Sequence, residues 1–333
     1  MAGDYLPSHS LAFTVILCTH NRVGMLSGCI ESILADLKGG LGELIVVDNA
    51  SSDGTSALIE SRIDEADIAL RLLQDNRLGK SYALNTGIAA AQGEILLFTD
   101  DDVIVEAGWS AALMRAFADS SVGAVAGRIQ PEWLAPPPRW LLGPHARMIT
   151  LIDMGNEPRE LGPAELPFGA NMAIRRAALG GRADPFDVHL GHRGRTVMAY
   201  EEVRLITEIR RDWRIVYEPQ AVLRHRILPE RAERSALRVA YFQTGFGNGR
   251  NSRRQGAQLG SLKGRARGAT LAFLRALSWS LRNRREVDLS PAAANRELTL
   301  YSELGWYLER ICAKHETFAE WLSESVGPLL RHL

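Results

Sequence analysis

The chain has 333 residues, enough for two domains or for one large α/β domain with an appendage. Hydrophobic residues make up 46% and charged residues 23% of it, which excludes disorder and collagen-like repeats for most of its length. The charges of the 39 basic and 39 acidic residues cancel, which argues against a nucleic-acid binder. Only three cysteines are present, which excludes a disulfide framework and favours a reducing, cytoplasmic setting.

Short apolar runs alternate with segments of helical periodicity from residue 13 onward. Strands are expected at Phe13–Cys18, Leu44–Val47, Ile68–Leu73, Ile95–Phe98 and Val122–Ala126, and helices at Met25–Leu37, Ser56–Ile63, Ser81–Ala91 and Ala107–Ala118. This alternation predicts an α/β fold with a doubly wound, mostly parallel sheet flanked by helices. Neither a secretory signal nor an apolar run of about 20 residues is found, so no membrane span is expected.

The second half of the chain is less regular. Residues 131–167 contain three consecutive prolines and are expected to form a loop over the sheet. Trp213–Glu218 predicts a last strand that Pro219 ends. Beyond about residue 230 the pattern predicts a helical extension. The string Gly245-x-Gly247-x-Gly249 has the wrong spacing for a dinucleotide site and is expected to be a flexible basic loop.

Polar clusters stand where three of the predicted parallel strands end: Thr19-His20-Asn21-Arg22, Asp48 with Asp53, and Asp100-Asp101-Asp102. Ligands of doubly wound sheets bind at the carboxyl ends of the strands, so these clusters predict one binding site. In an extended segment Asp100 and Asp102 point to the same side, where they are able to share Mg²⁺ or Mn²⁺. The alternative is an acidic turn that caps the next helix.

Several other side chains are candidates for ligand contact. Asp48 is placed to read a base or ribose, whereas Asp53 is equally suited to cap a helix. Lys80 is able to meet a phosphate at a helix start, although the surrounding sequence lacks the P-loop pattern. Glu201 and Glu202 offer a carboxylate base, or merely a solvated helix start. His225 is either structural or an extra ligand for a cation held by Asp102.

These clusters, taken in order, resemble the family 2 inverting glycosyltransferases of GT-A fold. The resemblance covers roughly residues 11–228 and is carried by Val15–Arg22, Val46–Thr55, Gly79–Gly87, Phe98–Asp102, Phe168–Arg176, Tyr200–Trp213, and Tyr217–Pro219 with His225. It implies a GT-A, Rossmann-like catalytic domain over residues 11–228, with a nucleotide-sugar half to about 127 and an acceptor half from 128. Residues 229–333 would form a basic, mainly helical extension outside the resemblance.

The resemblance also implies roles for individual residues. Nucleotide contacts are expected from Thr19, Asn21, Arg22, Asp48, Asp53, Lys80 and Asp101. Asp100 and Asp102, with His225, would hold Mn²⁺ or Mg²⁺. Glu202 stands at the place of the catalytic base, and because it replaces a more frequent Asp, Glu201 stays open as the alternative. Gly169, Asn171 and Trp133 are expected on the acceptor and sugar side.

The predicted activity is metal-dependent, inverting transfer of a hexosyl or N-acetylhexosaminyl group from a nucleotide-diphosphate sugar, with UDP-sugar favoured, to a glycan or lipid-linked acceptor. Polysaccharide or glycolipid assembly is the expected setting. A sugar nucleotidyltransferase is the enzymatic alternative, but its glycine-rich opening loop is missing after the first strand. A non-catalytic glycan- or lipid-binding scaffold is the other alternative, which the intact Asp100, Asp102 and Glu202 argue against.

Positive charge is concentrated near the end of the chain. Residues 231–285 contain twelve arginines and Lys263 against one acid, Glu233. Such a segment, mixed with leucines, suits a helix on the cytoplasmic face of an anionic membrane. It suits equally a helix packed on its own protein with arginines facing water, or an interface between copies of the chain. No nucleic-acid partner is expected.

Overall fold

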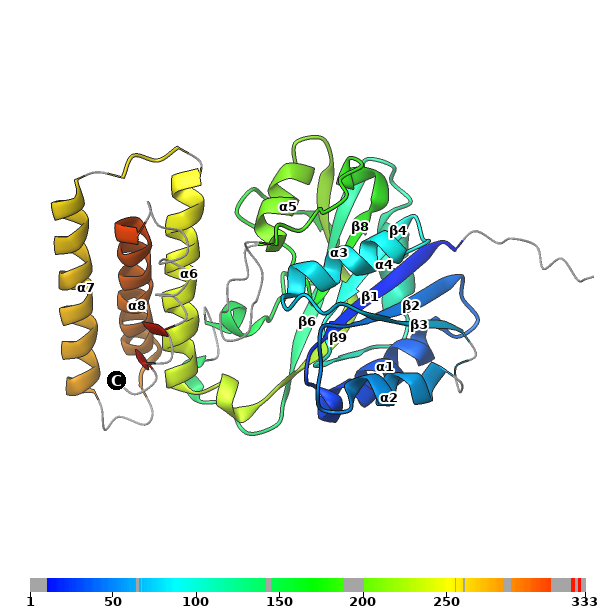
Figure 1. The fold of residues 1–333 in the computed structure, drawn as a ribbon, viewed down its shortest axis with the longest axis horizontal. Coiled ribbons are helices and arrows are strands. Elements are labelled where there is room, and N and C mark those ends of the chain that lie inside the picture. Colours follow the sequence, from blue (N-terminus) through cyan, green and yellow to red (C-terminus); the bar gives the residue numbers. More distant parts are fainter. Residues whose placement is uncertain are drawn as a thin grey trace, which may run out of the picture. The chain divides into compact units, whose positions relative to one another are not determined.

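The computed structural model describes residues 11–63, 66, 68–141, 145–188, 201–254, 256–259, 261–283, 289–312, 325–326 and 329–330. The chain separates into two compact units (Figure 1). The first comprises the described residues within Met1–Pro131, Ile152–Leu190 and Glu201–Arg226, and the second those within Glu132–Leu151 and Ile227–Leu333. Residues 132–151, which sequence analysis placed in the catalytic domain, are thus grouped with the helical unit.

Parallel strands form one half of the sheet in the first unit. They are β1 (Phe13–Thr19), β2 (Gly42–Asp48), β3 (Ala69–Gln74) and β4 (Ile95–Thr99), joined through α1 (Val23–Leu37), α2 (Thr55–Ile63) and α3 (Lys80–Ala90). Their order in the sheet is β3-β2-β1-β4. Every residue of β2 is buried, as expected where helices cover both faces of a parallel sheet.

The winding direction reverses after β3. The chain runs outward from β1 to β3 and then crosses back past β1 to β4, so the switch point lies between β1 and β4. Right-handed crossovers therefore place α1 and α2 on one side of the sheet and α3 on the other (Figure 1). A ligand site is expected at the carboxyl ends of β1 and β4, where the crevice opens.

The other half of the sheet is antiparallel. It contains β5 (Val103–Val105), β6 (Val122–Trp133), β7 (Arg159–Glu160), β8 (Asn171–Arg175) and β9 (Arg214–Ile227), with α4 (Trp109–Ala116), the 3-10 turn η3 (Arg176–Leu179) and α5 (Glu201–Ile209). The prediction that Pro219 ends the last strand is wrong, because β9 continues to Ile227. Pro219 lies between the residues that pair with β7 and those that pair with β5, where its missing N–H interrupts neither ladder.

The second unit is helical. It contains the 3-10 turns η1 (Arg139–Leu141), η2 (Ala146–Ile149) and η4 (Pro229–Arg231), and the helices α6 (Arg234–Arg254), α7 (Leu262–Arg282) and α8 (Pro291–Cys312). The predicted glycine loop is wrong, since Gly245 and Gly249 lie inside α6. A Cβ at either position would approach the backbone of α8 at Ser302 or Trp306, so glycine allows the two helices to pack closely.

Candidate active site

The predicted clusters meet at one edge of the sheet. Thr19 and Asp48 are paired at the ends of β1 and β2, and Asp100 follows the last residue of β4. Parallel register therefore brings together residues that are far apart in the sequence.

The three consecutive aspartates have different surroundings. The Asp100 carboxylate accepts a charged hydrogen bond from Lys80 Nζ at 2.6 Å. Asp101 is buried and accepts a hydrogen bond from the Thr19 hydroxyl at 2.7 Å. Burial, with the neighbouring Asp102 charge, raises the pKa of Asp101 to about 7. Thr19 and Asp101 thus fasten the end of β1 to the turn after β4.

Asp102 faces a histidine and an arginine. Its Oδ1 lies 3.2 Å from Nε2 of His225, and its Oδ2 lies 3.7 Å from the Arg22 guanidinium. His225 is 1% exposed, and its place in β9 follows from the pairing of that residue with Val103 of β5. It therefore lies within the last strand and not after it.

The side chains around Asp102 supply some of the ligands that a divalent cation needs. Within the described ranges no group of three or more His, Cys, Asp or Glu side chains is arranged to hold a metal ion. Asp102 and His225 supply a carboxylate and an imidazole, a combination that Mn²⁺ accepts. Mg²⁺ and Mn²⁺ commonly complete their coordination with substrate phosphates and water, so two protein ligands suffice for a cation that arrives with a diphosphate.

Glu202 lies in the first turn of α5, and its side chain is 9% exposed. A Cβ added at Gly169 would fall 2.5 Å from Glu202 Oε1, so the backbone at Gly169 forms one wall of the carboxylate's site. Burial raises the pKa of Glu202, the nearby Lys80 lowers it, and Asp100 raises it. The Glu201 side chain lies outside the described part of the structure.

The loops after β1 and β2 are tied to each other. Asn21, with φ of 51°, accepts a hydrogen bond from Ser52 N at 2.8 Å and donates its own N–H to the Ser51 hydroxyl at 2.9 Å. Asp53 accepts from Val23 N, at the start of α1, and from Thr55 N and its hydroxyl. These bonds, above all that from the Thr55 hydroxyl, lower the pKa of Asp53.

Asp48 is 2% exposed, and its carboxylate binds within its own loop. It accepts hydrogen bonds from Ser51 N at 2.9 Å and from the Ser56 hydroxyl. Both Asp48 and Asp53 thus shape the loop. Sequence analysis kept a capping role for Asp53 only, and it missed the hydrogen bonds that Asp48 accepts within its own loop. Each carboxylate oxygen has a second lone pair, so contact with a nucleotide remains a proposal.

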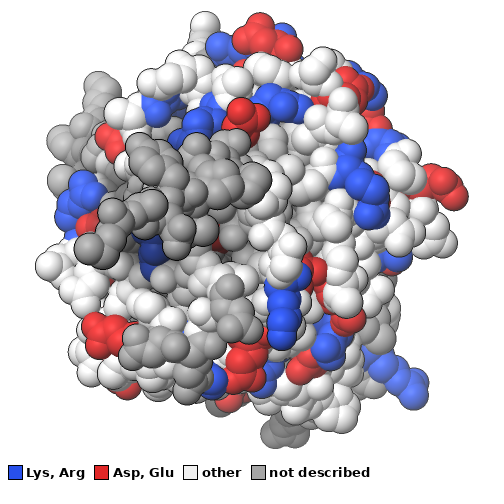
Figure 2. Space-filling model, turned by 90° about the vertical axis from the view of Figure 1, so that its right-hand side faces the viewer, with Lys and Arg blue, Asp and Glu red and all other residues white. Residues whose placement is uncertain are grey.

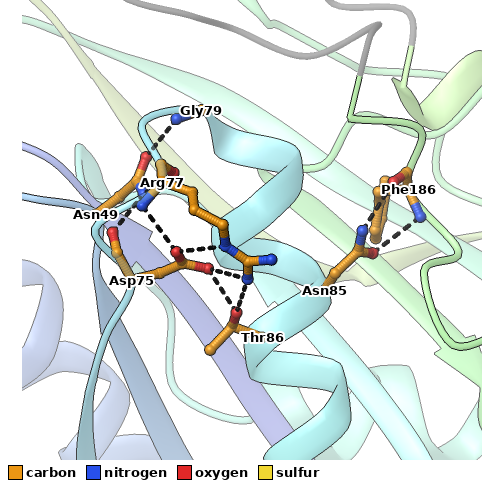
Figure 3. Close-up of polar contacts among 7 residues, drawn as sticks. All are labelled: Asn49, Asp75, Arg77, Gly79, Asn85, Thr86 and Phe186. Atoms are coloured by element: carbon orange, nitrogen blue, oxygen red, sulfur yellow. Dashed lines mark hydrogen bonds and ion pairs between the residues drawn. The ribbon is translucent and has the colours of Figure 1, made fainter.

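A polar network that sequence analysis missed holds the loop before α3 (Figure 3). The Asn49 amide donates to the carbonyls of Asp75 and Arg77 at 2.9 and 2.8 Å and accepts from Gly79 N at 2.8 Å. The Asp75 carboxylate accepts from Arg77 and from the Thr86 hydroxyl, and the Arg77 bond lowers its pKa to about 2.

The network fixes Gly79, which caps α3 with a φ of 143° that favours glycine. Lys80 follows directly, so Asn49 positions the lysine that reaches Asp100. The only sequence signal was the run Asp48-Asn49, where an amide follows the strand end.

Two of the acceptor-side predictions need revision. Asn171 is fully buried, and its amide is occupied by Trp109 Nε1 and by the carbonyls of Arg128 and Ala221 at 2.8 to 2.9 Å. A buried amide with these partners supports the sheet, which argues against the predicted role of Asn171 in binding the acceptor. Trp133 belongs to the second unit, where it packs against the cluster that contains Trp140 and Leu141.

The sequence model of the family described as Glycosyl transferase family 2 matches residues 14–180, just over half of the 333 residues. An uncharacterized protein, y4gI of Sinorhizobium fredii (strain NBRC 101917 / NGR234), is 30% identical over 118 residues. The poly-beta-1,6-N-acetyl-D-glucosamine synthase of Staphylococcus aureus (strain MSSA476) is 33% identical over 115 residues. These alignments cover 35% and 34% of this chain but 13% and 27% of the relatives, so the chain matches only a small part of either.

Solved structures resemble the chain over longer stretches. The mannosyltransferase PcManGT from Pyrobaculum calidifontis, in complex with GDP-Man and Mn²⁺, aligns over 98% of this chain and 87% of its own, with a TM-score of 0.53 and 18% identity. GalNAc-T7 with UDP, GalNAc and Mn²⁺ aligns over 73% and 51%, with a TM-score of 0.52 and 16% identity. This likeness confirms the prediction of a GT-A fold with helices after it.

Proposed function

The chain belongs to glycosyl transferase family 2, and on that premise we propose that it is a metal-dependent, inverting glycosyltransferase. Its donor is a nucleotide-diphosphate sugar, with UDP as the favoured nucleotide, and the transferred group is a hexose or N-acetylhexosamine. The acceptor is a hydroxyl of a glycan or lipid-linked sugar in polysaccharide or glycolipid assembly. The matched region of a polysaccharide synthase supports that setting.

One observation carries the proposal: Lys80 links the donor side of the site to its base. Its ammonium contacts Asp100 at 2.6 Å and also lowers the pKa of Glu202. Geometry supports the same link, since the Thr99 hydroxyl, directly before Asp100, donates to the Ala170 carbonyl at 2.9 Å, and the neighbouring Gly169 borders the Glu202 carboxylate. These contacts support a site in which the metal-side carboxylates and the buried base share one small volume. A donor diphosphate and an acceptor hydroxyl must meet in such a volume for direct transfer.

On the donor side, Lys80 is placed to meet a phosphate from the start of α3, where the helix dipole also favours negative charge. Arg22 and Thr19 line the end of β1 beside Asp102 and Asp101. Asp102 and His225 would hold the cation, while Asp100 is paired with Lys80. When bound, Mn²⁺ or Mg²⁺ would offset the charge that develops on the leaving diphosphate.

On the acceptor side, Glu202 takes the proton from the attacking hydroxyl. Its raised pKa makes it a stronger base than an exposed glutamate, while Lys80 keeps its ionised form accessible. The hydroxyl then attacks the anomeric carbon opposite the diphosphate, so the configuration inverts in one step. No covalent intermediate with the chain is formed.

The proposal is tested with a panel of UDP- and GDP-sugars, simple glycoside acceptors, and Mn²⁺, Mg²⁺ or excess chelator. We expect metal-dependent release of a nucleoside diphosphate, and a product whose anomeric configuration, read by NMR, is opposite to that of the donor. Pyrophosphate chemistry with a sugar phosphate would indicate a nucleotidyltransferase instead. Retained configuration, or full activity in chelator, would contradict the mechanism.

A further inference from the structure

Helix α7 packs its smallest side chains inward. Ala269, Ala272, Ala276 and Ser280 are buried, and Ser280 forms a 2.8 Å hydrogen bond with the Tyr301 hydroxyl of α8. A Cβ at Gly268 would collide with the Tyr307 ring of α8. Helix α8 lies between α6 and α7 (Figure 1), and among the described helices it is the one on which α7 packs.

Large apolar side chains of α7 are exposed instead. Leu271, Phe273, Leu274 and Leu281 are between 40% and 60% exposed. Leu271, Leu274 and Leu281 are spaced by three and seven residues, which places them on one side of a helix. A helix that only packs on its own protein normally has the reverse arrangement, with large apolar residues inside.

The charged residues of α7 are all basic. Lys263, Arg267, Arg275 and Arg282 are exposed, and in the part of the chain that the structure describes none of them has an ion-pair partner. Elsewhere, on the face drawn in Figure 2, basic and acidic side chains are interspersed. The outer face of α7, defined as these four cations with Leu271, Phe273, Leu274 and Leu281, therefore combines apolar surface with unbalanced positive charge.

The arginines of α6 behave differently. Arg234 and Arg238 both pair with the buried Glu297 of α8 at 2.6 Å, and Arg253 pairs with the buried Glu309 at 3.2 Å. Part of the positive charge of residues 231–285 thus serves the packing of α6 on α8. Among the side chains that the structure describes in this segment, exposed cations without an ion-pair partner lie on α7.

We propose that the outer face of α7 binds the surface of an anionic lipid bilayer. Leucine and phenylalanine side chains enter the boundary of the acyl chains, while lysine and arginine side chains contact anionic headgroups. A second copy of the chain fits this face poorly, because a two-fold contact would set the same four cations against each other. Membrane binding would bring the active site to lipid-linked acceptors, but it does not depend on the transfer reaction.

The test is flotation of the full chain with phosphatidylcholine vesicles, with and without phosphatidylglycerol, at low and high salt (~0.05 M and ~0.5 M). We expect binding to the anionic vesicles that weakens at high salt. Lys263→Glu with Arg267→Glu should weaken it by more than about tenfold, since each removed cation is worth about fivefold. Leu274→Ser with Leu281→Ser should also weaken it by about tenfold or more.

Matched controls change exposed residues elsewhere. Arg115→Glu with Arg211→Glu changes the net charge by the same amount as the α7 charge variant. Leu41→Ser with Leu134→Ser removes two exposed leucine side chains, as the α7 leucine variant does. Circular dichroism melting curves show whether each variant is folded. The proposal is overturned if the wild-type chain does not bind anionic vesicles at low salt, or if the α7 variants bind these vesicles as well as the control variants do. It is equally overturned if light scattering shows that the wild-type chain is an oligomer and the α7 variants are monomers, while vesicle binding is unchanged.

Discussion

Gly169→Ala is the sharpest probe of how Glu202 is positioned. The new Cβ would lie 2.5 Å from Glu202 Oε1, and contacts below 3.0 Å essentially do not occur. The carboxylate oxygen must therefore move by at least about 0.5 Å, the difference between these two distances. Gly169 is not among the glycines with positive φ, so alanine suits its backbone.

The cost should appear in catalysis and not in stability. The atom that must move is the end of a flexible side chain, so we expect a loss of less than about 1 kcal/mol in the free energy of unfolding. A misplacement of about 1 Å costs roughly 10²-fold in rate, so a shift of half that size predicts a fall in kcat of about tenfold. Donor affinity should stay unchanged, because the proposed role of Glu202 is to contact the acceptor hydroxyl and not the donor.

The assay compares kcat, the donor Kd and the melting temperature of Gly169→Ala with those of Gly162→Ala. Gly162 is the matched control, since its added Cβ would lie 3.5 Å from the Glu165 carboxylate, an ordinary contact. If Gly169→Ala keeps the wild-type kcat, the position of Glu202 does not limit transfer and the reasoning fails. A large loss of stability would show that Gly169 is needed for the fold.

Three further expectations follow from the site. Asn49→Ala removes three hydrogen bonds from the loop before Lys80, so the free energy of unfolding, measured with denaturant, should fall by about 1–3 kcal/mol. Titration with the donor should show weaker binding, and unchanged affinity would show that Asn49 does not position Lys80. Asp102→Ala should abolish metal-dependent turnover without unfolding the chain. If this variant keeps the wild-type turnover, Asp102 is not a metal ligand. Because burial raises the pKa of Glu202 and a base must be ionised, kcat/KM should rise with pH through that raised pKa. If kcat/KM is already independent of pH just above an ordinary glutamate pKa of about 4.3, this expectation is contradicted.

The first half of the fold could be predicted from the sequence because three of its four strands, β1, β2 and β4, are buried on both faces. Runs such as Leu44–Val47 leave little ambiguity, and the polar residue that ends each run marks the sheet edge. Thr19, Asp48 and Asp100 were found by this reasoning, since parallel strands end at a common edge. Their chemistry could then be argued from residue types alone.

The antiparallel half was less accessible, because its strands are stabilised by partners that are distant in the sequence. β9 runs through Pro219, and nothing local shows that Pro219 falls between two ladders. Asn171 looked like an acceptor ligand, yet its amide joins three elements of the core. A polar residue beside a motif is equally able to support the sheet or to face the ligand, and only its burial distinguishes the two.

The helical unit shows a further limit. Periodicity indicates that α7 is a helix, but it does not reveal that glycine and alanine face α8 while leucines face outward. That choice depends on the space that the large side chains of α8 leave. The string at Gly245 was misread for the same reason, since glycines that permit close helix packing look like loop residues in the sequence.

The most direct test of the central claim is the transfer rate of Glu202→Gln, measured beside its donor affinity. The substitution keeps the size of the side chain and removes the proton acceptor, and a buried carboxyl with a raised pKa is not needed in its ionised form for stability at neutral pH. We predict wild-type binding of the nucleotide sugar in calorimetry and transfer reduced by roughly 10²–10⁴-fold. Wild-type transfer by Glu202→Gln, with Glu201→Gln inactive instead, would contradict the account and assign the base to Glu201.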